Sequence, residues 1–239
     1  MAIHIMELNG KINNVVFYTR YGKNFARALP KEYKRTPAMQ TRSSNFGIAA
    51  ASGKMIRRVL DKIIPFPKDK TMQSGLSGAI AKWIGGREIK DILPETNIAW
   101  LADFEFNNKC RLVNRLKAAL EVLNPSAGML QLRVPAFIPI ESIIAPEASV
   151  SVTLQVGVAA VKLERFVPGY NSFGSLEIPY NEISTGPHLI DLPINMESGN
   201  LLITVCALQY HVKQRSNVNT VISDKPAYMP ATVVEARYC

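Results

Sequence analysis

The second half of the chain is a series of short apolar runs separated by turn residues, and this pattern restricts the fold most. The runs are rich in β-branched residues or alternate apolar with polar side chains, as strands do. Glycine, proline and asparagine separate them, as at Pro168-Gly169. The expected strands are Met129–Val134, Ala148–Val161, Ser175–Pro179, Leu189–Leu192, Leu201–Val212, a short one at Val221, and 229–236. Short strands at regular spacing predict an antiparallel β-sandwich of immunoglobulin-like or jelly-roll type over residues 126–239.

A hairpin pattern lies near the start of the chain. Two β-prone runs, Ile12–Tyr18 and Phe25–Leu29, flank the tetrapeptide Tyr21-Gly22-Lys23-Asn24. Glycine and asparagine tolerate the positive φ that tight hairpin turns require. We therefore predict a β-hairpin over residues 12–29. Because an isolated hairpin is marginally stable in water, it must pack on its own body or pair with another chain.

Two helices are expected between the hairpin and the sandwich. Thr36 fits an N-cap, and Pro37 fits the first helical position. An apolar stripe at helical spacing then runs from Phe46 to Ile63, and a second pattern covers residues 71–86. The predicted fold class is α+β, with an N-terminal β-hairpin and helices followed by a C-terminal antiparallel β-sandwich. Its parts are a basic β-hairpin arm at 1–35, a mainly helical region at 36–125 and the sandwich at 126–239.

The basic excess of the chain is confined to its first third. Residues 1–72 carry 14 lysines and arginines against four acidic residues, whereas residues 126–239 carry seven against nine. Such an asymmetry indicates an arm that meets something acidic, either nucleic acid, a phospholipid surface or the acidic face of another copy. The expected contact residues are the cations Arg20, Lys23, Arg27, Lys31, Lys34 and Arg35 and the apolar Val15, Phe17 and Phe25.

Motifs that carry chemistry are weak in this sequence. Gly47–Met55 is similar to a phosphate-binding loop, but five residues separate its glycines, and Met55 replaces the magnesium-binding hydroxyl. Gly75–Ala79 is similar to a nucleophile elbow but lacks the second glycine. The histidines have no cysteine or carboxylate at metal-ligand spacing. We therefore predict a non-enzymatic protein without cofactor or metal, although an acid–base pair brought together only by folding stays open.

The three cysteines and the N-terminus indicate the compartment. The cysteines are odd in number and widely spaced, which favours a reducing environment, and Cys206 lies in an apolar run that predicts a buried thiol. No apolar run approaches the roughly 20 residues that span a bilayer. The first residues lack the basic and apolar regions of a signal peptide. We expect a cytoplasmic protein, or one incorporated into an assembled particle, with no membrane span.

The hairpin and the start of the following helix also resemble a bacterial protein family of unknown function. The matching positions are Gly10–Tyr18, Gly22, Lys23, Arg27, Pro30, Thr36, Pro37, Gln40, Arg42 and Phe46, with Pro139, Ala145, Pro146, Leu192 and Pro193 in the second half. The resemblance implies the same layout of a basic N-terminal hairpin, a helix and a β-rich C-terminal part. It implies no activity.

Two functions fit these patterns. The first is a structural protein that self-assembles through its basic arm into a homo-oligomer, such as a ring, a filament or a virion-like or phage-like particle. The second is a nucleic-acid-binding module in which lysine and arginine contact phosphates and aromatic residues stack on bases. A solvated basic face that only aids solubility is the third interpretation. We rank assembly first, because the hairpin needs a partner and no motif for a reaction is present.

Overall fold

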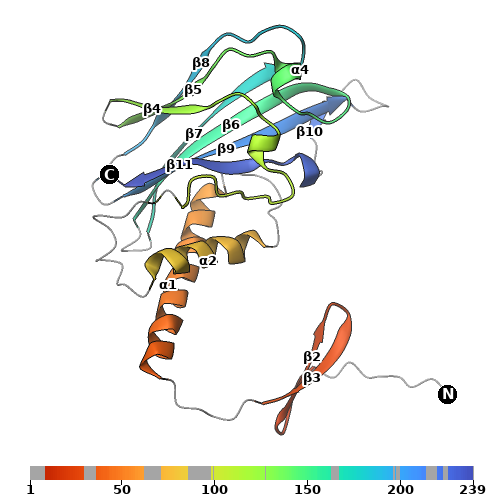
Figure 1. The fold of residues 1–239 in the computed structure, drawn as a ribbon, viewed down its shortest axis with the longest axis vertical. Helices are drawn as coiled ribbons and strands as arrows, with labels where there is room; N and C mark the ends of the chain where they lie inside the picture. The colour runs from red at the N-terminus through yellow and green to blue at the C-terminus, as the bar shows by residue number, and fades with distance from the viewer. Residues whose placement is uncertain are drawn as a thin grey trace, which may run out of the picture. The chain divides into compact units, whose positions relative to one another are not determined.

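The computed structural model describes residues 9–29, 36–61, 71–85, 98, 100–126, 128–162, 167–195, 197, 200–213, 220–222 and 226–238. The chain divides into two compact units, Met1–Gln40 and Thr41–Cys239. Helices and antiparallel strands are both present, so the predicted α+β class is confirmed (Figure 1). Among the described helices, none has the length and apolar character that crossing a bilayer requires.

The first unit contains a three-stranded antiparallel sheet. Its strands are β1 (Gly10–Ile12), β2 (Val15–Arg20) and β3 (Lys23–Ala28), in that order across the sheet. The predicted hairpin is formed by β2 and β3, whereas β1 was not expected. A turn at Asn13-Asn14 interrupts the predicted first strand, so Ile12 belongs to β1 and not to the hairpin. The two-residue loop Tyr21-Gly22 joins β2 to β3, and its φ angles of 54° and 71° are those of a type I′ turn.

Helix α1 (Pro37–Leu60) begins where the sequence predicts and crosses the boundary between the units. The Met39 N–H donates to the Thr36 hydroxyl at 3.3 Å, which confirms Thr36 as the cap. From Ala49 onward the apolar stripe is buried in the second unit. The predicted stop at Pro65 lies outside the described residues.

Helix α2 (Met72–Ile84) packs closely on α1 at a glycine. A Cβ atom added at Gly53 would lie 3.1 Å from the Ser77 hydroxyl, so the two backbones approach where α1 has its smallest residue. Gly47 and Met55 also lie inside α1. Gly53 therefore serves helix packing, and the segment lies within a helix rather than in a phosphate-binding loop between strand and helix.

Two antiparallel sheets make up most of the second unit. The larger has the order β10-β9-β6-β7, with β11 also paired to β9, and the smaller has the order β4-β5-β8. The larger consists of β6 (Ser149–Lys162), β7 (Val167–Pro179), β9 (Leu201–Lys213), β10 (Thr220–Ile222) and β11 (Ala231–Tyr238). The smaller consists of β4 (Glu121–Ser126), β5 (Met129–Val134) and β8 (His188–Pro193). All the predicted strands are present, and β4 is the one that was not expected in this unit. The predicted turn at Pro168-Gly169 is wrong, because these residues lie inside β7, which begins before the predicted strand Ser175–Pro179.

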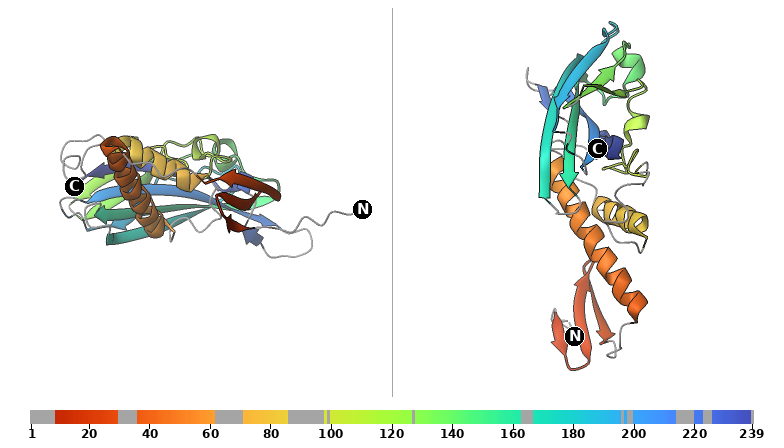
Figure 2. Two further views of the ribbon diagram at one scale, coloured as in Figure 1. Left: turned by 90° about the horizontal axis from the view of Figure 1, so that it is seen from below. Right: turned by 90° about the vertical axis from the view of Figure 1, so that its left-hand side faces the viewer.

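The five-stranded sheet is buried on both faces where the second half of β6 lies beside the first half of β9, whereas Phe173 of β7 is 68% exposed. Alternate residues of β6 separate between two hydrophobic clusters: Val158 faces the cluster shared with the three-stranded sheet, and Ala159 faces the cluster shared with α1 and α2. Figure 2 shows the two sheets as separate layers of this unit. The immunoglobulin-like or jelly-roll topology stays a prediction, since two sheets that share a core do not by themselves define it.

Strand β9 shows the effect of this double burial on sequence. All eight residues of Leu201–Leu208 are buried, because neighbouring layers cover both sides of the strand. A strand buried on both faces reads as one continuous apolar run rather than an alternation. Cys206 lies within it, and burial raises the pKa of its thiol, so the predicted inert, buried cysteine is confirmed.

The segment between α2 and β4 is mostly irregular where it is described. It contains the short 3₁₀ turn η1 (Leu112–Asn114), and a four-residue helix, α4 (Pro139–Ser142), follows β5. Before η1 the backbone runs along the edge of β11, where the Asp103 N–H donates to the Val233 carbonyl at 2.8 Å. This segment covers part of the edge of the five-stranded sheet and brings polar side chains to it.

Candidate interaction surface

Strand pairing divides the side chains of the N-terminal sheet between two surfaces. In an antiparallel pair, opposite residues point to the same side, and successive residues along a strand point to opposite sides. Val16 pairs with Lys11 on one side and with Arg27 on the other. Phe17, the next residue, pairs with Ala26. The register therefore assigns each side chain of the three strands to one of two faces.

One surface gathers the positive charge. This surface, the cationic face, comprises Lys11, Val16, Tyr18, Arg20, Lys23, Phe25 and Arg27. It holds all four of the lysines and arginines in residues 9–29, and no acidic residue occurs in the sequence between Glu7 and Glu32. No salt bridge within the sheet therefore neutralises these cations.

Aromatic rings lie between the cations of this face. The rings of Tyr18 and Phe25 stack with their centroids 5.6 Å apart and an interplanar angle of 20°. The guanidinium of Arg27 lies 5.9 Å from the centroid of the Tyr18 ring. Tyr18 and Phe25 remain 37% and 42% exposed, so both rings are accessible to a further planar group.

The other surface carries no ionisable side chain. This surface, the apolar face, comprises Gly10, Ile12, Val15, Phe17, Thr19, Asn24, Ala26 and Ala28. Its polar end is satisfied internally, because the Thr19 hydroxyl donates to the Asn24 side-chain oxygen at 2.8 Å. The remaining residues of this face offer only apolar contacts through their side chains.

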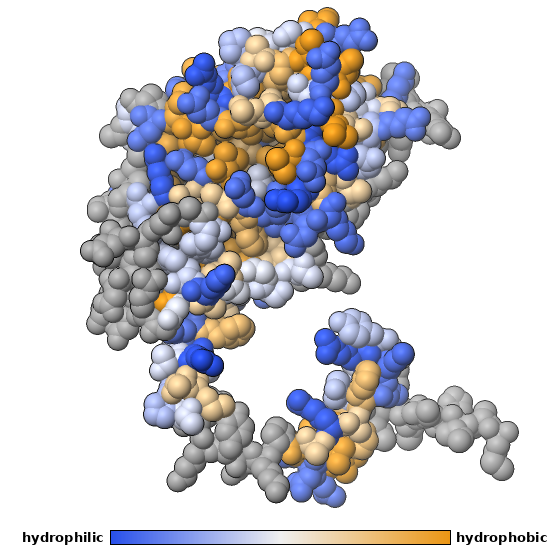
Figure 3. Space-filling model, in the orientation of Figure 1, coloured by the Kyte–Doolittle hydropathy of each residue, from blue (hydrophilic) through white to orange (hydrophobic). Residues whose placement is uncertain are grey.

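No residue in the described part of the N-terminal sheet is buried. Every residue of β1 and β3 is exposed, and in β2 only Val15, Val16 and Phe17 are even partly covered. Figure 3 shows apolar residues at the surface of this sheet. A small sheet gains independent stability when a hydrophobic face is covered. The strands of this sheet therefore form no core of their own.

The tip of the hairpin presents a strained aromatic residue. Tyr21 has a φ of 54° and is 88% exposed. The left-handed region costs a bulky residue about 1–2 kcal/mol, which asparagine or glycine largely avoids. The Arg20 guanidinium lies 5.0 Å from the centroid of the Tyr21 ring. A third aromatic ring is thus held beside a cation of the cationic face.

The structure separates the predicted contact residues rather than gathering them. Arg20, Lys23, Arg27 and Phe25 lie on the cationic face, Val15 and Phe17 lie on the apolar face, and Lys31, Lys34 and Arg35 lie outside the described residues. The prediction grouped Phe25 with Val15 and Phe17, but the strand register places Phe25 on the opposite face of the sheet from these two residues. The predicted set also omits Tyr18 and Lys11. Strict alternation counted back from the turn assigns Tyr18 to the cationic face, whereas Lys11 reaches it only because β1 pairs Lys11 with Val16.

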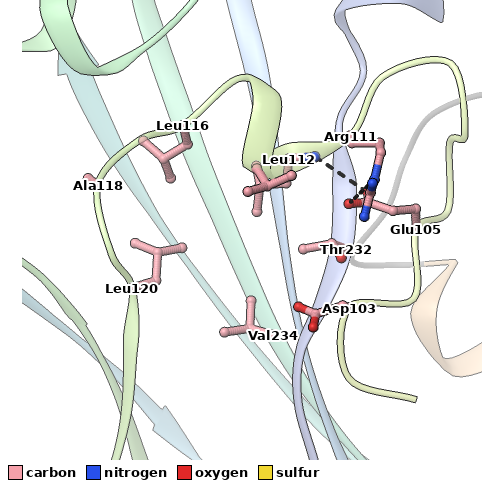
Figure 4. Close-up of a pocket in the computed structure, with 10 residues that line it drawn as sticks. Asp103, Glu105, Arg111, Leu112, Leu116, Ala118, Leu120, Thr232 and Val234 are labelled. Carbon is pink, nitrogen blue, oxygen red and sulfur yellow. Dashed lines mark hydrogen bonds and ion pairs between the residues drawn. The ribbon is translucent and has the colours of Figure 1, made fainter. Parts of the chain in front are cut away.

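A pocket in the second unit is the other candidate site (Figure 4). It has a volume of about 440 Å³ and lies between β11, η1 and the start of β4. Its lining is polar at Asp103, Glu105, Arg111 and Thr232 and apolar at Leu112, Val113, Leu116, Ala118, Leu120 and Val234. The polar and apolar residues lie at opposite ends in the close-up, so the pocket is amphipathic.

Glu105 is the unusual group of this pocket. Its side chain is only 8% exposed, and its carboxylate accepts a hydrogen bond from the Leu112 N–H at 3.4 Å. The Arg111 Nε lies 3.6 Å from the carboxylate. Burial dominates over both of these favourable contacts and raises the pKa of Glu105 to about 7.

The pocket brings a second carboxyl group, that of Asp103, into the same lining as Glu105. None of its lining residues is a histidine, cysteine, serine or lysine, and the Thr232 hydroxyl already donates to the Phe104 carbonyl at 3.2 Å. Across the described ranges no group of three or more metal-ligating side chains occurs. We therefore assign no reaction to the pocket and treat the two faces of the N-terminal sheet as the candidate site.

The comparisons with known proteins do not identify a functional site. No protein-family model matches the chain, and no curated protein matches its sequence. The resemblance of residues 10–46 to a bacterial family stays a prediction.

Proposed function

We propose that this protein is a non-enzymatic structural subunit that forms a homo-oligomer through the apolar face of its N-terminal sheet. The observation that supports this most is that no described residue of the sheet is buried, although one face is apolar. Apolar sheet faces pack on one another about 10 Å apart. In this proposal the second half of the chain, with its antiparallel sandwich, is the body of the subunit.

A second copy of the same face fits the chemistry of the apolar face. In a two-fold contact each patch meets itself, so any charge on it would face a like charge. The apolar face carries no ionisable side chain, and the four cations of β1–β3 all lie on the other side. Two sheets can therefore stack without repulsion, with both cationic faces turned outward.

The edge strands supply a second kind of contact. Strand β3 is an edge of the sheet, all of its residues are exposed, and it contains no proline. Such an edge presents unpaired N–H and C=O groups to another chain. Face stacking alone closes a dimer, and edge pairing between such dimers continues the assembly into a ring, a filament or a particle.

Two neighbouring aromatic residues provide the test. Phe17→Lys places a charge on the apolar face, and Tyr18→Lys places the same charge on the cationic face one residue later. We expect light scattering of nuclease-treated protein in moderate to high salt to show oligomers for the natural chain and for Tyr18→Lys. Phe17→Lys should be monomeric.

Two results would contradict the proposal. One is a natural chain that stays monomeric as its concentration is raised. The other is a Phe17→Lys variant that assembles like the natural chain. Circular dichroism of both variants should show that the body is folded in each case, so that loss of assembly is not loss of structure.

A further inference from the structure

We infer that the cationic face is a binding surface for single-stranded nucleic acid, and that it acts independently of the self-association proposed above. The inference rests on three properties of this face: unneutralised charge, exposed stacked rings, and a strained aromatic residue at the hairpin tip.

The charges of the cationic face lie in two rows on either side of the rings. Lys11 and Arg27 share the row of Val16, and Arg20 pairs with Lys23 at the other end of β2. The rows are separated by four residues of β2, about 13 Å at the rise of an antiparallel strand. The backbone of a few nucleotides spans this distance, so phosphates can contact both rows at once.

The rings between the two rows suit unpaired bases. Tyr18 and Phe25 form a stack that is open to a further ring. Stacking on aromatic side chains is the main sequence-tolerant contact that proteins make with single strands. In a duplex the bases already stack on their neighbours, and a lipid headgroup has no aromatic ring to stack. The chemistry therefore favours a single strand over a duplex or an anionic membrane.

Tyr21 extends this surface at the tip of the hairpin. An exposed tyrosine in the left-handed region is a costly choice for a turn that glycine or asparagine fills easily. Strained residues of this kind cluster at sites where ligands bind. The Arg20 guanidinium lies beside the Tyr21 ring, just as the Arg27 guanidinium lies beside the Tyr18 ring on the cationic face.

The experiment is fluorescence anisotropy of the full chain with two labelled probes. One is an oligothymidylate of about 16 nucleotides, within the site sizes known for single-strand binders, and the other is a duplex of equal length. We expect tighter binding of the single strand. Its logarithmic salt slope should be about −3 between roughly 50 and 200 mM salt, because four cations contact phosphates at about −0.7 each. Replacing Arg27 with Gln should reduce the slope by about 0.7.

Leucine variants separate stacking from charge and from folding. Tyr18→Leu and Phe25→Leu remove the two rings, and we expect each to weaken single-strand binding at least about 5-fold. Phe17→Leu removes a ring from the apolar face of the same strand, and its binding should match that of the natural chain. Phe17→Lys should still bind the single-stranded probe as a monomer. Any increase in affinity that comes from several copies binding one strand is lost in this variant.

Three outcomes would overturn the inference. The first is no binding in dilute salt. The second is equal binding of single strand and duplex with no loss in Tyr18→Leu, which indicates a general polyanion surface. The third is an equal loss in Phe17→Leu and Tyr18→Leu, which indicates damage to the sheet. Loss of binding with assembly intact contradicts only this inference, whereas binding by a protein that never assembles contradicts only the proposed function.

Discussion

At the scale of single residues, the N-terminal sheet separates two chemistries that are adjacent in the sequence. Phe17 and Tyr18 are consecutive aromatic residues of β2, yet Phe17 lies on the uncharged apolar face and Tyr18 lies on the face that carries the four cations. Because successive side chains of a strand point to opposite sides, a change at either position tests one surface and spares the other. This allows self-association and polyanion binding to be measured separately in one strand.

Tyr21 gives the first prediction at this scale. Tyr21→Asn puts a residue that tolerates positive φ into the turn, so the hairpin should gain about 1 kcal/mol of stability. Hydrogen exchange of the β2 and β3 amides in the full chain measures this gain as slower exchange. The same variant should bind single strands more weakly, because the exposed ring is lost.

Tyr21→Phe is the control for this turn. It keeps the ring and the strained backbone and removes only the hydroxyl group, so both the exchange rates and the binding should stay near those of the natural chain. Faster exchange in Tyr21→Asn would show that the tyrosine stabilises the turn instead of straining it.

Glu105 gives the second prediction, on pH dependence. Its pKa of about 7 in the folded protein lies above the ordinary value of 4.5, so between these values the folded state holds a proton that the unfolded chain has lost. Raising the pH through this window therefore destabilises the fold, by about 2 kcal/mol between pH 5 and pH 8. In Glu105→Gln this contribution should disappear. Urea unfolding near the two pH values measures the difference.

The surface carboxylate Glu121 is the matched control. It forms an exposed ion pair with Arg133 at 3.3 Å, and such pairs contribute about 1 kcal/mol or less. Glu121→Gln should leave the pH dependence of the natural chain in place. If Glu105→Gln keeps that dependence as well, burial of Glu105 is not its cause.

At the scale of elements, the two sheets of the second unit approach each other closely at a glycine of β7. A Cβ atom added at Gly174 would lie 2.5 Å from the Ile190 Cγ2 of β8. Gly174→Ala should therefore destabilise the protein by about 1–3 kcal/mol through overpacking, measured by thermal or urea unfolding. Gly186→Ala is the control, since nothing lies within 4 Å of its added Cβ.

A double variant confirms the partner in this contact. If Ile190 is the obstacle, the cost of Gly174→Ala should shrink when it is measured in an Ile190→Ala background. An equal cost in both backgrounds would mean that the strain lies in the backbone of β7 rather than between the sheets.

The sequence predicted most of the elements because their patterns are local. Alternation and turn residues identify the strands of the second half, and the Thr36 cap identifies the start of α1. Strand β4 escaped prediction because Asn124 and Pro125 interrupt its pattern, and the structure has a register shift between Leu123 and Ser126 there. Strand β1 has only three residues, too few to show a period.

The candidate site was predicted only in part. The charge and the hairpin were visible, but the assignment of side chains to two faces depends on the register, which the loop at Tyr21-Gly22 fixes. The pocket could not be predicted. Its lining combines an irregular segment that begins at Asp103 with Thr232 and Val234 from the far end of the chain, and no local pattern connects them.

At the scale of the whole molecule, the hydrophobic core and the positive charge belong to different parts of the chain. Both hydrophobic clusters draw their buried members from Ala49 onward, and none comes from the described strands β1–β3. The charged and apolar faces therefore contribute little to the stability of the second unit.

The mass of the assembled protein in solution is the measurement that decides the proposal. Light scattering, with negative-stain electron microscopy of the same sample, compares the nuclease-treated natural chain with a chain lacking residues 1–35 in moderate to high salt. We predict a mass that is a multiple of 26.5 kDa and regular particles for the natural chain, and a folded monomer for the shortened one. A natural chain at 26.5 kDa, or a shortened chain that assembles unchanged, would contradict assembly through the N-terminal sheet.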